Sequence, residues 1–514
     1  MLTALVFIPL VTAYASGAVL PRSSARSIAG QCKARPQLGR TSVISAGEPA
    51  LGNPDMVAAA PPTPRLQSFP CGDSLDARIF TLALPAFINF LILPVTGAVD
   101  LFFIGKLGSA LAAAGQAAAN QVYSTAALLT NVLPVVTVPL VAKAYAAGDQ
   151  EEVKRQVGGS IFLSLVLGAL VSLLVGLGAN RWLLLVGSAA ALPFSLPYLV
   201  YRLPGVLPDT LSMVGFSSFR GIMDTVTPLK ISFVACLVNA VCNPILMFTM
   251  NMGMAGAALA TSLSQLVTGM AYFALLLKRN LLSLATALRP PSKKLLTQLA
   301  AAGGAVQVRN IALNVAFVAI TKTTQSLDTT GVAAAAHAVT IALWQLGGVV
   351  LFAMGSCATI LTSAELGNTD KTPSDARAVA RRLLCWGALL GAALGGLQLC
   401  GLPLLGLFTP LPEVRRAARL PSIIGAVLQL INGIVFVGEG LMVASGAFQQ
   451  LAAGQVVATA AFLAALRLAP SSLVSVWLCF WVFNSVRLLN FGWFFLFAKS
   501  PLMPEGRKWG EARG

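Results

Sequence analysis

Three carboxylates interrupt long apolar stretches of the sequence and are its main candidates for chemistry. Asp100 lies in "GAVDLFFIGKLG", Asp209 in "GVLPDTL" and Glu439 in "VGEGLMV". In a membrane, a charged side chain at a helix centre costs about 2.5–3.5 kcal/mol, so each of them needs a partner or a function. Burial can hold a carboxylate close to its titration point, where it binds and releases a proton or Na⁺. All three are therefore candidate ion-coupling groups.

The sequence leaves a structural interpretation open for each of these carboxylates. Asp100 could be solvated near the end of its helix, or could pair with Lys106 or an arginine. Asp209 could be a helix-end residue beside Pro208, which interrupts backbone hydrogen bonding. Glu439 could form a structural ion pair with an arginine inside the membrane.

Amides and arginines in other apolar stretches supply the candidate partners. Asn239 and Asn243 are four residues apart and share a helix face, so both join the candidate ion-coupling set. Asn432 lies seven residues before Glu439 and shares its face. Arginine does not titrate in proteins, so it can only pair with a carboxylate or bind an anionic substrate. The candidate substrate-binding residues are Asn432 and three arginines, namely Arg202, Arg309 and Arg487.

The composition places these residues in a membrane protein. The chain has 514 residues, of which 56% are hydrophobic and 10% charged, and its mean hydropathy is +0.79. A soluble chain of this length could not cover its apolar surface with so few charges. The net charge of +17 then indicates basic loops on one side of a membrane, and we expect no nucleic-acid partner.

The sequence shows no pattern for enzyme chemistry, metal binding or cofactor binding. It has no H-E-x-x-H motif, no Ser/His/Asp arrangement and no Walker A motif, and His337 is its only histidine. Its eight cysteines form no C-x-x-C pair. We therefore expect no catalytic residue, no metal, no cofactor and no direct use of ATP.

Apolar runs predict an all-α protein with twelve membrane-spanning helices. The runs lie near residues 79–104, 117–142, 157–179, 196–217, 228–250, 254–277, 295–321, 332–364, 379–408, 417–445, 449–468 and 471–498. Pro85 and Pro94 both fall in the first run, where each removes a backbone donor and favours a kink. Gly387, Gly391 and Gly395 form a ridge of small residues on the ninth run, which predicts the close approach of another helix.

A polar break divides the twelve runs into two halves. It separates an N-terminal lobe, residues 77–278, from a C-terminal lobe, residues 295–498, and leaves residues 279–294 as the linker. The segments "LGSALAAAGQAAANQ" and "LDTTGVAAAAHAVTI" occupy matching places in the two halves. An even number of spans gives both halves the same orientation, so ligands are expected to bind between them. Basic residues concentrate in alternate loops, which places both ends of the mature chain on the cytosol-like or stroma-like side.

The first 76 residues have the composition of targeting signals. Residues 1–20 form a short apolar run that ends in small residues, which is typical of a signal peptide. Residues 21–76 begin rich in Arg and Ser, and no acid precedes Glu48, as in transit peptides. This order resembles the two-part presequences of algae with complex plastids and predicts a plastid envelope; a secretory-pathway or plasma-membrane location is the alternative. A basic tail, residues 499–514, ends the chain.

Several motifs, taken in order, carry a family resemblance. The stretch "LALPAFINFLILPVTGAVDLFFIGKLG" looks like the first helix of MATE (multidrug and toxic compound extrusion) transporters, and "FRGIMDTVTP" resembles the loop before their fifth helix. "NAVCNPILMF" continues the match, and "VWLCFWVFNSVRLLNFGW" fits the plastid-type plant and algal branch of the DinF-like members. The resemblance covers roughly residues 77–498.

This resemblance implies two six-helix lobes in a V that exchange organic compounds for H⁺ or Na⁺ by alternating access. Asp100 matches the family's coupling aspartate in the first helix, whereas Asn243 stands where many relatives carry an aspartate. Because an amide adds no charge to a cation site, this difference favours H⁺ over Na⁺. Glu439 matches an aspartate of the plastid-type branch, and Asp209 stands where relatives carry an apolar residue.

We therefore predict a monomeric secondary active transporter that exports small organic compounds, with organic anions among the candidate substrates. Arg309 favours anions, because other branches of the family place an acid in this helix. The expected partners are the small organic substrate and membrane lipid. A flippase for lipid-linked substrates, from the wider superfamily, and a passive channel for organic solutes are the alternative functions. We also hypothesise that a kink in the first helix switches when Asp100 is protonated.

Overall fold

The computed structural model describes residues 69–107, 110–186, 191–327, 332–368, 373–407, 411–468 and 472–497, together with Leu502. The signal-like segment, most of the transit-like segment and most of the basic tail lie outside these ranges. Every regular element in the described ranges is a helix, which confirms the predicted all-α class.

The helices of the N-terminal lobe correspond to the first six membrane spans predicted from the sequence. Its elements are α3 (Ser74–Gly105), α4 (Ala110–Ala127), α5 (Val132–Ala146), α6 (Gln150–Val186), α7 (Leu192–Arg202), the 3₁₀ turn η2 (Leu203–Gly205), α8 (Val206–Gly221), α9 (Val226–Pro244), the π turn η3 (Ile245–Thr249) and α10 (Gly253–Lys278). α4 and α5 meet at a bend of 45° and are together long and apolar enough for one span. The fourth expected run coincides with α7, η2 and α8, which follow one another directly.

The linker and the C-terminal lobe complete the array. Their elements are α11 (Leu284–Ala287), α12 (Lys293–Ser326), α13 (Val332–Gly367), α14 (Pro373–Cys400), the 3₁₀ turn η4 (Leu402–Leu407), α15 (Pro412–Ala444), α16 (Phe448–Leu468) and α17 (Leu473–Phe497). In the described part of the chain, ten helices are individually long and apolar enough to cross a membrane, and the bent pair raises the number to eleven. Each of the twelve expected runs thus has a helical counterpart.

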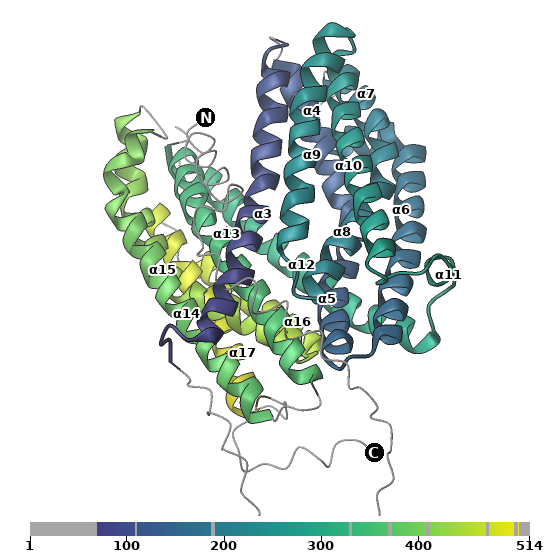
Figure 1. Ribbon diagram of the computed structural model, residues 1–514. Coiled ribbons are helices and arrows are strands. Elements are labelled where there is room, and N and C mark those ends of the chain that lie inside the picture. The colour runs from purple at the N-terminus through teal and green to yellow at the C-terminus, as the bar shows by residue number, and fades with distance from the viewer. Residues whose placement is uncertain are drawn as a thin grey trace, which may run out of the picture. The chain divides into compact units, whose positions relative to one another are not determined.

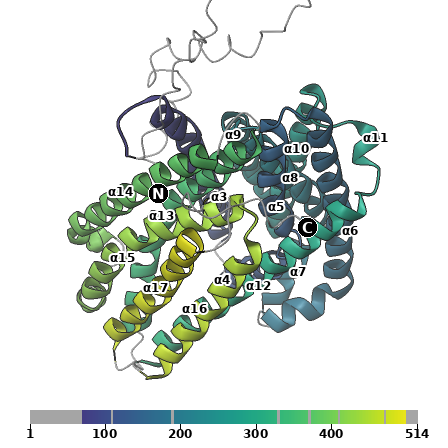
Figure 2. The same ribbon diagram turned by 90° about the horizontal axis from the view of Figure 1, so that it is seen from below.

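Each lobe has its own core. α8 packs against α5, α6 and α10 in the N-terminal lobe, while α15 packs against α13, α14 and α17 in the C-terminal lobe. Figures 1 and 2 both show α14, α15 and α17 on one side and α6, α8 and α10 on the other. Buried aromatic side chains, including Trp344, Trp477 and Phe480, fill the C-terminal core.

The glycine ridge of α14 brings that helix against α15. A methyl group added at Gly391 would lie 2.4 Å from the carbonyl oxygen of Gln429, and one at Gly387 would lie 2.6 Å from the carbonyl oxygen of Gly433. Real Cβ atoms do not approach oxygen so closely, so these positions admit only glycine at this helix separation. The close approach predicted from the ridge is therefore present.

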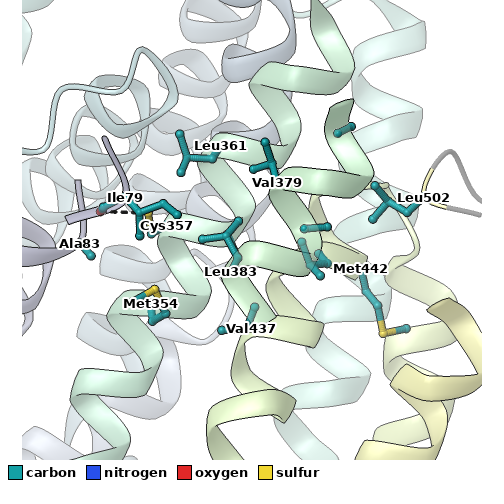
Figure 3. Packing of buried hydrophobic residues seen from close by; sticks show 14 of the residues in the cluster. Ile79, Ala83, Met354, Cys357, Leu361, Val379, Leu383, Val437, Met442 and Leu502 are labelled. Carbon is teal, nitrogen blue, oxygen red and sulfur yellow. Dashed lines mark hydrogen bonds between the residues drawn. The ribbon is translucent and has the colours of Figure 1, made fainter. Parts of the chain in front are cut away.

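The beginning of α3 packs in the core of the other lobe. Ile79 and Ala83 lie among Met354, Cys357 and Leu383, which belong to α13 and α14 (Figure 3). The sulfur of Cys357 lies 3.6 Å from the carbonyl oxygen of Ile79. α3 therefore ties the C-terminal lobe to the N-terminal lobe.

The two ends of α3 pack in different cores. The far end of α3, at Ile104, lies in an N-terminal cluster with Val122 and Tyr198, whereas its start lies in the C-terminal cluster. A helix that is apolar for most of its length can bury successive segments against different partners. Leu502, from the expected basic tail, also packs in the C-terminal cluster.

Candidate functional site

Asp100 lies at a junction of three helices in the N-terminal lobe. Its side chain is 5% exposed, and Oδ1 accepts a hydrogen bond of 2.8 Å from Nδ2 of Asn243 on α9. Oδ2 lies 3.4 Å from the hydroxyl of Thr261 on α10, which can donate to it. Asn243 Nδ2 also lies 3.1 Å from Oδ1 of Asn239. The sequence-predicted group Asp100, Asn239 and Asn243 is thus brought together, and Thr261 is a member that sequence reasoning missed.

The structure agrees with neither of the two structural interpretations of Asp100. It is buried, so it is not a solvated helix-end residue. The ammonium of Lys106 lies 4.6 Å from the ring centroid of Phe102, and no ion pair among the described residues includes Asp100. The groups that hydrogen-bond to the carboxylate are therefore neutral.

The amide of Asn243 suits both protonation states of Asp100. Its Nδ2 donates to the carboxylate, while its Oδ1 is buried and has no hydrogen-bond partner. Rotating the amide by half a turn would present the oxygen instead, which can accept from a protonated carboxyl group. The site can therefore hold the acid with or without its proton.

Asp209 belongs to a second polar group of the N-terminal lobe. The hydroxyl of Tyr123 donates a 2.9 Å hydrogen bond to Asp209 Oδ2, and Gln265 Nε2 lies 3.3 Å from the same hydroxyl. Gln265 and Thr261 are one turn apart on the same face of α10, so the two polar groups are neighbours along this helix, and no hydrogen bond between the described residues joins the two acids. Asp209 is therefore not a direct partner of Asp100.

Arg202 pairs with neutral groups near this second polar group. Its Nη1 donates to Asn120 Oδ1 at 2.8 Å and lies 3.1 Å from the hydroxyl of Tyr198. The guanidinium stacks 4.4 Å from the ring centroid of Tyr123. Arg202 therefore contacts protein groups, and it is not among the residues that line the cavity between the lobes.

Glu439 is held by two arginines. Arg309 Nη2 lies 2.5 Å from Oε2, and Arg487 donates to Oε1 from Nε at 2.9 Å and from Nη2 at 2.7 Å. Arg487 also contacts Asn484 Oδ1 at 3.1 Å. Of the two interpretations open for Glu439, this geometry is that of the ion pair. Asn432 lies elsewhere, buried beside Gln429.

A cavity of about 440 Å³ lies between the lobes. α3, α5 and α8 of the N-terminal lobe and α12, α13 and α15 of the C-terminal lobe contribute most of its lining. The charged residues of the lining are Arg220, Arg309 and Glu439. Arg309 is the only sequence-predicted substrate-binding residue among them. Arg220 was not among the residues predicted from the sequence, although its position at the end of an apolar run, in "FRGIMDTVTP", is a usable signal.

An ionic cluster joins the lobes at the start of α3. Arg382 of α14, whose side chain is fully buried, contacts Asp73 Oδ2 at 2.9 Å and Asp76 Oδ2 at 2.8 Å. Hydrogen bonding from Arg382 lowers the pKa of Asp73 from 3.8 to about 2. Trp386 Nε1 donates to Asp76 at 2.7 Å, and Arg78 pairs with Glu365 at 3.2 Å.

Cys71 lies close to Asp73 and Asp76, so the three offer ligand atoms of the kind that bind metal ions. The guanidinium of Arg382 already contacts all three side chains, including the Cys71 sulfur at 3.4 Å. A cation in this position would have to displace a buried positive charge. The group therefore functions as an interlobe contact.

Comparisons with known proteins agree with the fold and the motifs. The MatE family model matches residues 85–245 and 306–481. The chain is 29% identical over 440 residues to "Protein DETOXIFICATION 44, chloroplastic" of Arabidopsis thaliana, which covers 82% of each chain. It is 26% identical over 448 residues to "Protein DETOXIFICATION 45, chloroplastic" of the same plant, covering 81% of this chain and 77% of the relative.

A solved structure shows the same fold. The chain is similar to the Vibrio cholerae MATE transporter VcmN in the bent form, with a TM-score of 0.73 and 20% sequence identity. The similarity covers 82% of this chain and 96% of the other. The helices of both lobes thus follow an arrangement seen before.

Proposed function

Because this chain belongs to the MatE family of multi-pass membrane transporters, we propose that it exchanges protons for small organic compounds, with Asp100 as the proton-carrying group. The family consists of transporters and not of enzymes. The observation that carries the proposal is a buried carboxylate whose hydrogen-bond partners are all neutral. Such a group gains and loses a proton without breaking an ion pair.

The position of Asp100 on α3 supports a route from proton binding to lobe movement. The start of α3 packs in the C-terminal core, and the segment that carries Asp100 packs in the N-terminal lobe. Pro85 and Pro94 lie between these two contacts, and neither has a backbone N–H to stabilise the helix there. Protonating Asp100 weakens its attraction for the Asn243 amide, and a helix weakened at two prolines can bend in response.

The neutral partners also favour H⁺ over Na⁺ as the coupling ion. Na⁺ is held by several oxygen ligands, and sites for cations gain strength from charged ones. Here the amides of Asn239 and Asn243 contribute no charge, so Asp100 alone balances a cation. A single proton neutralises this carboxylate fully.

Glu439 takes a different role in this proposal. Two arginines occupy both of its carboxylate oxygens, and protonation would leave the buried Arg487 and the partly buried Arg309 without a counter-charge. We therefore assign Glu439 and Arg487 to holding Arg309 in place at the cavity wall. Asp209, whose partner is Tyr123, is not required for the exchange.

The relatives support a plastid location. The two plant relatives carry the word chloroplastic in their names, and the first 76 residues of this chain have the composition of a signal followed by a transit peptide. We place the transporter in a plastid envelope, with the secretory pathway as the alternative. Fluorescence of a C-terminally tagged full chain in an alga with complex plastids distinguishes the two.

Transport by purified protein in liposomes tests the coupling. An imposed pH gradient is expected to accelerate movement of organic probes, and Asp100→Asn is expected to abolish this acceleration because an amide cannot take up a proton. Glu413→Gln is the matched control, since Glu413 is an exposed carboxylate at the start of α15. Normal gradient dependence in Asp100→Asn would show the proposal to be wrong.

The same assay separates the alternatives. A response to a Na⁺ gradient alone assigns Na⁺ as the coupling ion. Flux that ignores both gradients indicates a passive channel. Movement of a lipid-linked compound between leaflets, without either gradient, indicates a flippase.

A further inference from the structure

We propose that the cavity between the lobes binds an aromatic carboxylate, and that Arg220 is the residue that holds its negative charge. This inference rests on the proposed function, because it names the substrate class for the transporter's central cavity. It moves the expected anion contact away from Arg202, Arg309 and Arg487, all of which have protein partners.

Arg220 presents a positive charge that no carboxylate balances. It lies in the last turn of α8 and lines the cavity. Its Nε is buried and has no hydrogen-bond partner, and no ion pair among residues of the described ranges includes it. An unpaired charge in a low-dielectric site is costly, and an anionic ligand removes that cost.

The other charged residues of the lining do not supply the missing negative charge. Glu439 is the only acid in the lining, and its two oxygens contact Arg309 and Arg487. The region therefore carries more arginines than carboxylates. A cationic substrate would enter against this excess, whereas an anion would be attracted by it.

A row of phenyl rings crosses the cavity between the two lobes. The ring centroids of Phe216 and Phe90 are 6.1 Å apart, those of Phe90 and Phe352 are 5.0 Å apart, and those of Phe352 and Phe436 are 6.4 Å apart. The guanidinium of Arg220 lies 5.0 Å from the Phe216 centroid and 5.4 Å from that of Phe90. An aromatic ring can pack edge-to-face in this row while its carboxylate contacts Arg220.

Two further residues of the lining carry donor atoms that lack a protein partner. Arg309 Nε and Ser356 Oγ, on the C-terminal side of the cavity, are buried without hydrogen-bond partners. Together with Arg220 Nε they place unpartnered donors on both lobes. The volume of about 440 Å³ falls within the range of roughly 300–1,000 Å³ of small-molecule sites. A ring with a carboxylate and a second polar substituent satisfies this arrangement.

The charge of the substrate has a measurable consequence for the exchange. A proton that moves in and a monovalent anion that moves out both transfer positive charge in the same direction. One-for-one exchange with an aromatic carboxylate is therefore electrogenic, and a membrane potential alone drives it. One-for-one exchange with a monovalent cation moves no net charge.

Binding of three probes of similar size to the purified full chain tests the site. The probes are 4-hydroxybenzoate, the neutral 4-hydroxybenzyl alcohol and the cation benzyltrimethylammonium. Arg220→Gln is expected to weaken binding of 4-hydroxybenzoate about tenfold or more, because it removes a charge-assisted hydrogen bond. Binding of the neutral alcohol is expected to change by less than about twofold, because Arg220→Gln keeps the aromatic row. Arg467→Gln, an exposed arginine at the end of α16, is the control and is expected to leave all three unchanged.

Wild-type transport gives a second readout that needs no variant. With equal pH on both sides, an imposed membrane potential is expected to drive uptake of 4-hydroxybenzoate into liposomes. The inference is supported if the membrane potential drives uptake and if Arg220→Gln weakens binding of 4-hydroxybenzoate but not of the alcohol. The inference is wrong if Arg220→Gln weakens binding of 4-hydroxybenzoate and of the alcohol equally. It is also wrong if the wild-type protein neither binds nor transports 4-hydroxybenzoate.

The two proposals fail in different ways. If no probe responds to a pH gradient, proton-coupled exchange is wrong whatever the cavity binds. If a pH gradient drives benzyltrimethylammonium while 4-hydroxybenzoate neither binds nor moves, the coupling stands and the substrate class is wrong.

Discussion

The side-chain amide of Asn243 on α9 donates a 2.8 Å hydrogen bond to the carboxylate of Asp100 on α3. The two residues are 143 positions apart in the chain, and both are buried. An amide in this place leaves Asp100 without an acidic neighbour in contact. The charge of the site therefore depends on one carboxylate, which makes the contact a sensitive place to test coupling.

Replacing Asn243 with Asp is expected to move the pH dependence of transport to higher pH by about one unit or more. Two carboxylates within hydrogen-bond distance cannot both ionise easily, so the pair keeps a shared proton at higher pH. Initial rates of probe uptake across a series of pH values measure the shift. Asn280→Asp, in the exposed linker, adds an acid elsewhere and is expected to leave the profile in place.

Replacing Arg382 with Gln is expected to destabilise the folded protein by about 3–5 kcal/mol, because Asp76 would be left buried without its cation. The side chains of Arg382 and Asp76 are 0% and 4% exposed, so solvent cannot compensate. Thermal unfolding in detergent measures the loss. Arg381→Gln removes an exposed arginine from the adjacent position, and an equal effect there would contradict the assignment.

Lowering the pH is expected to weaken the contact between Arg382 and Asp73. Its pKa is lowered from 3.8 to about 2 by the hydrogen bond from Arg382, so the folded state holds the ionised form more strongly than the unfolded state. The resulting stability is present above pH 4 or so and is lost as the pH falls towards about 2. The thermal midpoint of Asp73→Asn should therefore fall less than that of wild type between about pH 5 and pH 3. Parallel falls would exclude this role.

Replacing Gly391 with Ala is expected to separate α14 from α15 and lower the thermal midpoint. The added methyl group would lie 2.4 Å from the carbonyl oxygen of Gln429, which is backbone and cannot move aside cheaply. Gly396→Ala is the matched control on the same helix, since nothing lies within 4 Å of its added methyl group. The control should be neutral or slightly stabilising, because Ala favours helix over Gly by about 1 kcal/mol.

Replacing Pro85 with Ala is expected to reduce transport several-fold while the thermal midpoint stays unchanged or rises. Ala restores a backbone donor toward the carbonyl of Thr81 and straightens or stiffens α3 between its contacts with the two lobes. Turnover in liposomes and thermal unfolding of the same preparation measure the two effects. Pro412→Ala, at the exposed start of α15, is the control. Unchanged turnover in Pro85→Ala would remove the proline-kink hypothesis.

The helices and the first candidate residue could be predicted because they depend on neighbouring residues. Hydropathy over about twenty residues marks a membrane span whatever it packs against. An isolated acid such as Asp100 is conspicuous in such a run, and glycines four residues apart on α14 share a face in any helix. The packing of the two ends of α3 in different cores could not be predicted, because an apolar helix carries no mark of which partner each segment will bury.

The partners of each charge were decided only by the tertiary structure. The sequence offered Arg202, Arg309 and Arg487 as candidate substrate-binding arginines without indicating which acid each would contact. In the structure Arg309 and Arg487 pair with Glu439, and Arg202 donates to Asn120. Arg220, which the sequence did not single out, lines the cavity and forms no ion pair within the described part of the chain.

The physical reason is the range over which each property acts. The sequence by itself determined which stretches span the membrane, since burial of apolar surface depends on local composition. Electrostatic pairing acts over a few ångströms and depends on which helices lie side by side. The contact of Asp100 with Asn243, and the exposure of Arg220 to the cavity, follow from helices far apart in the chain, so only the folded arrangement could decide them.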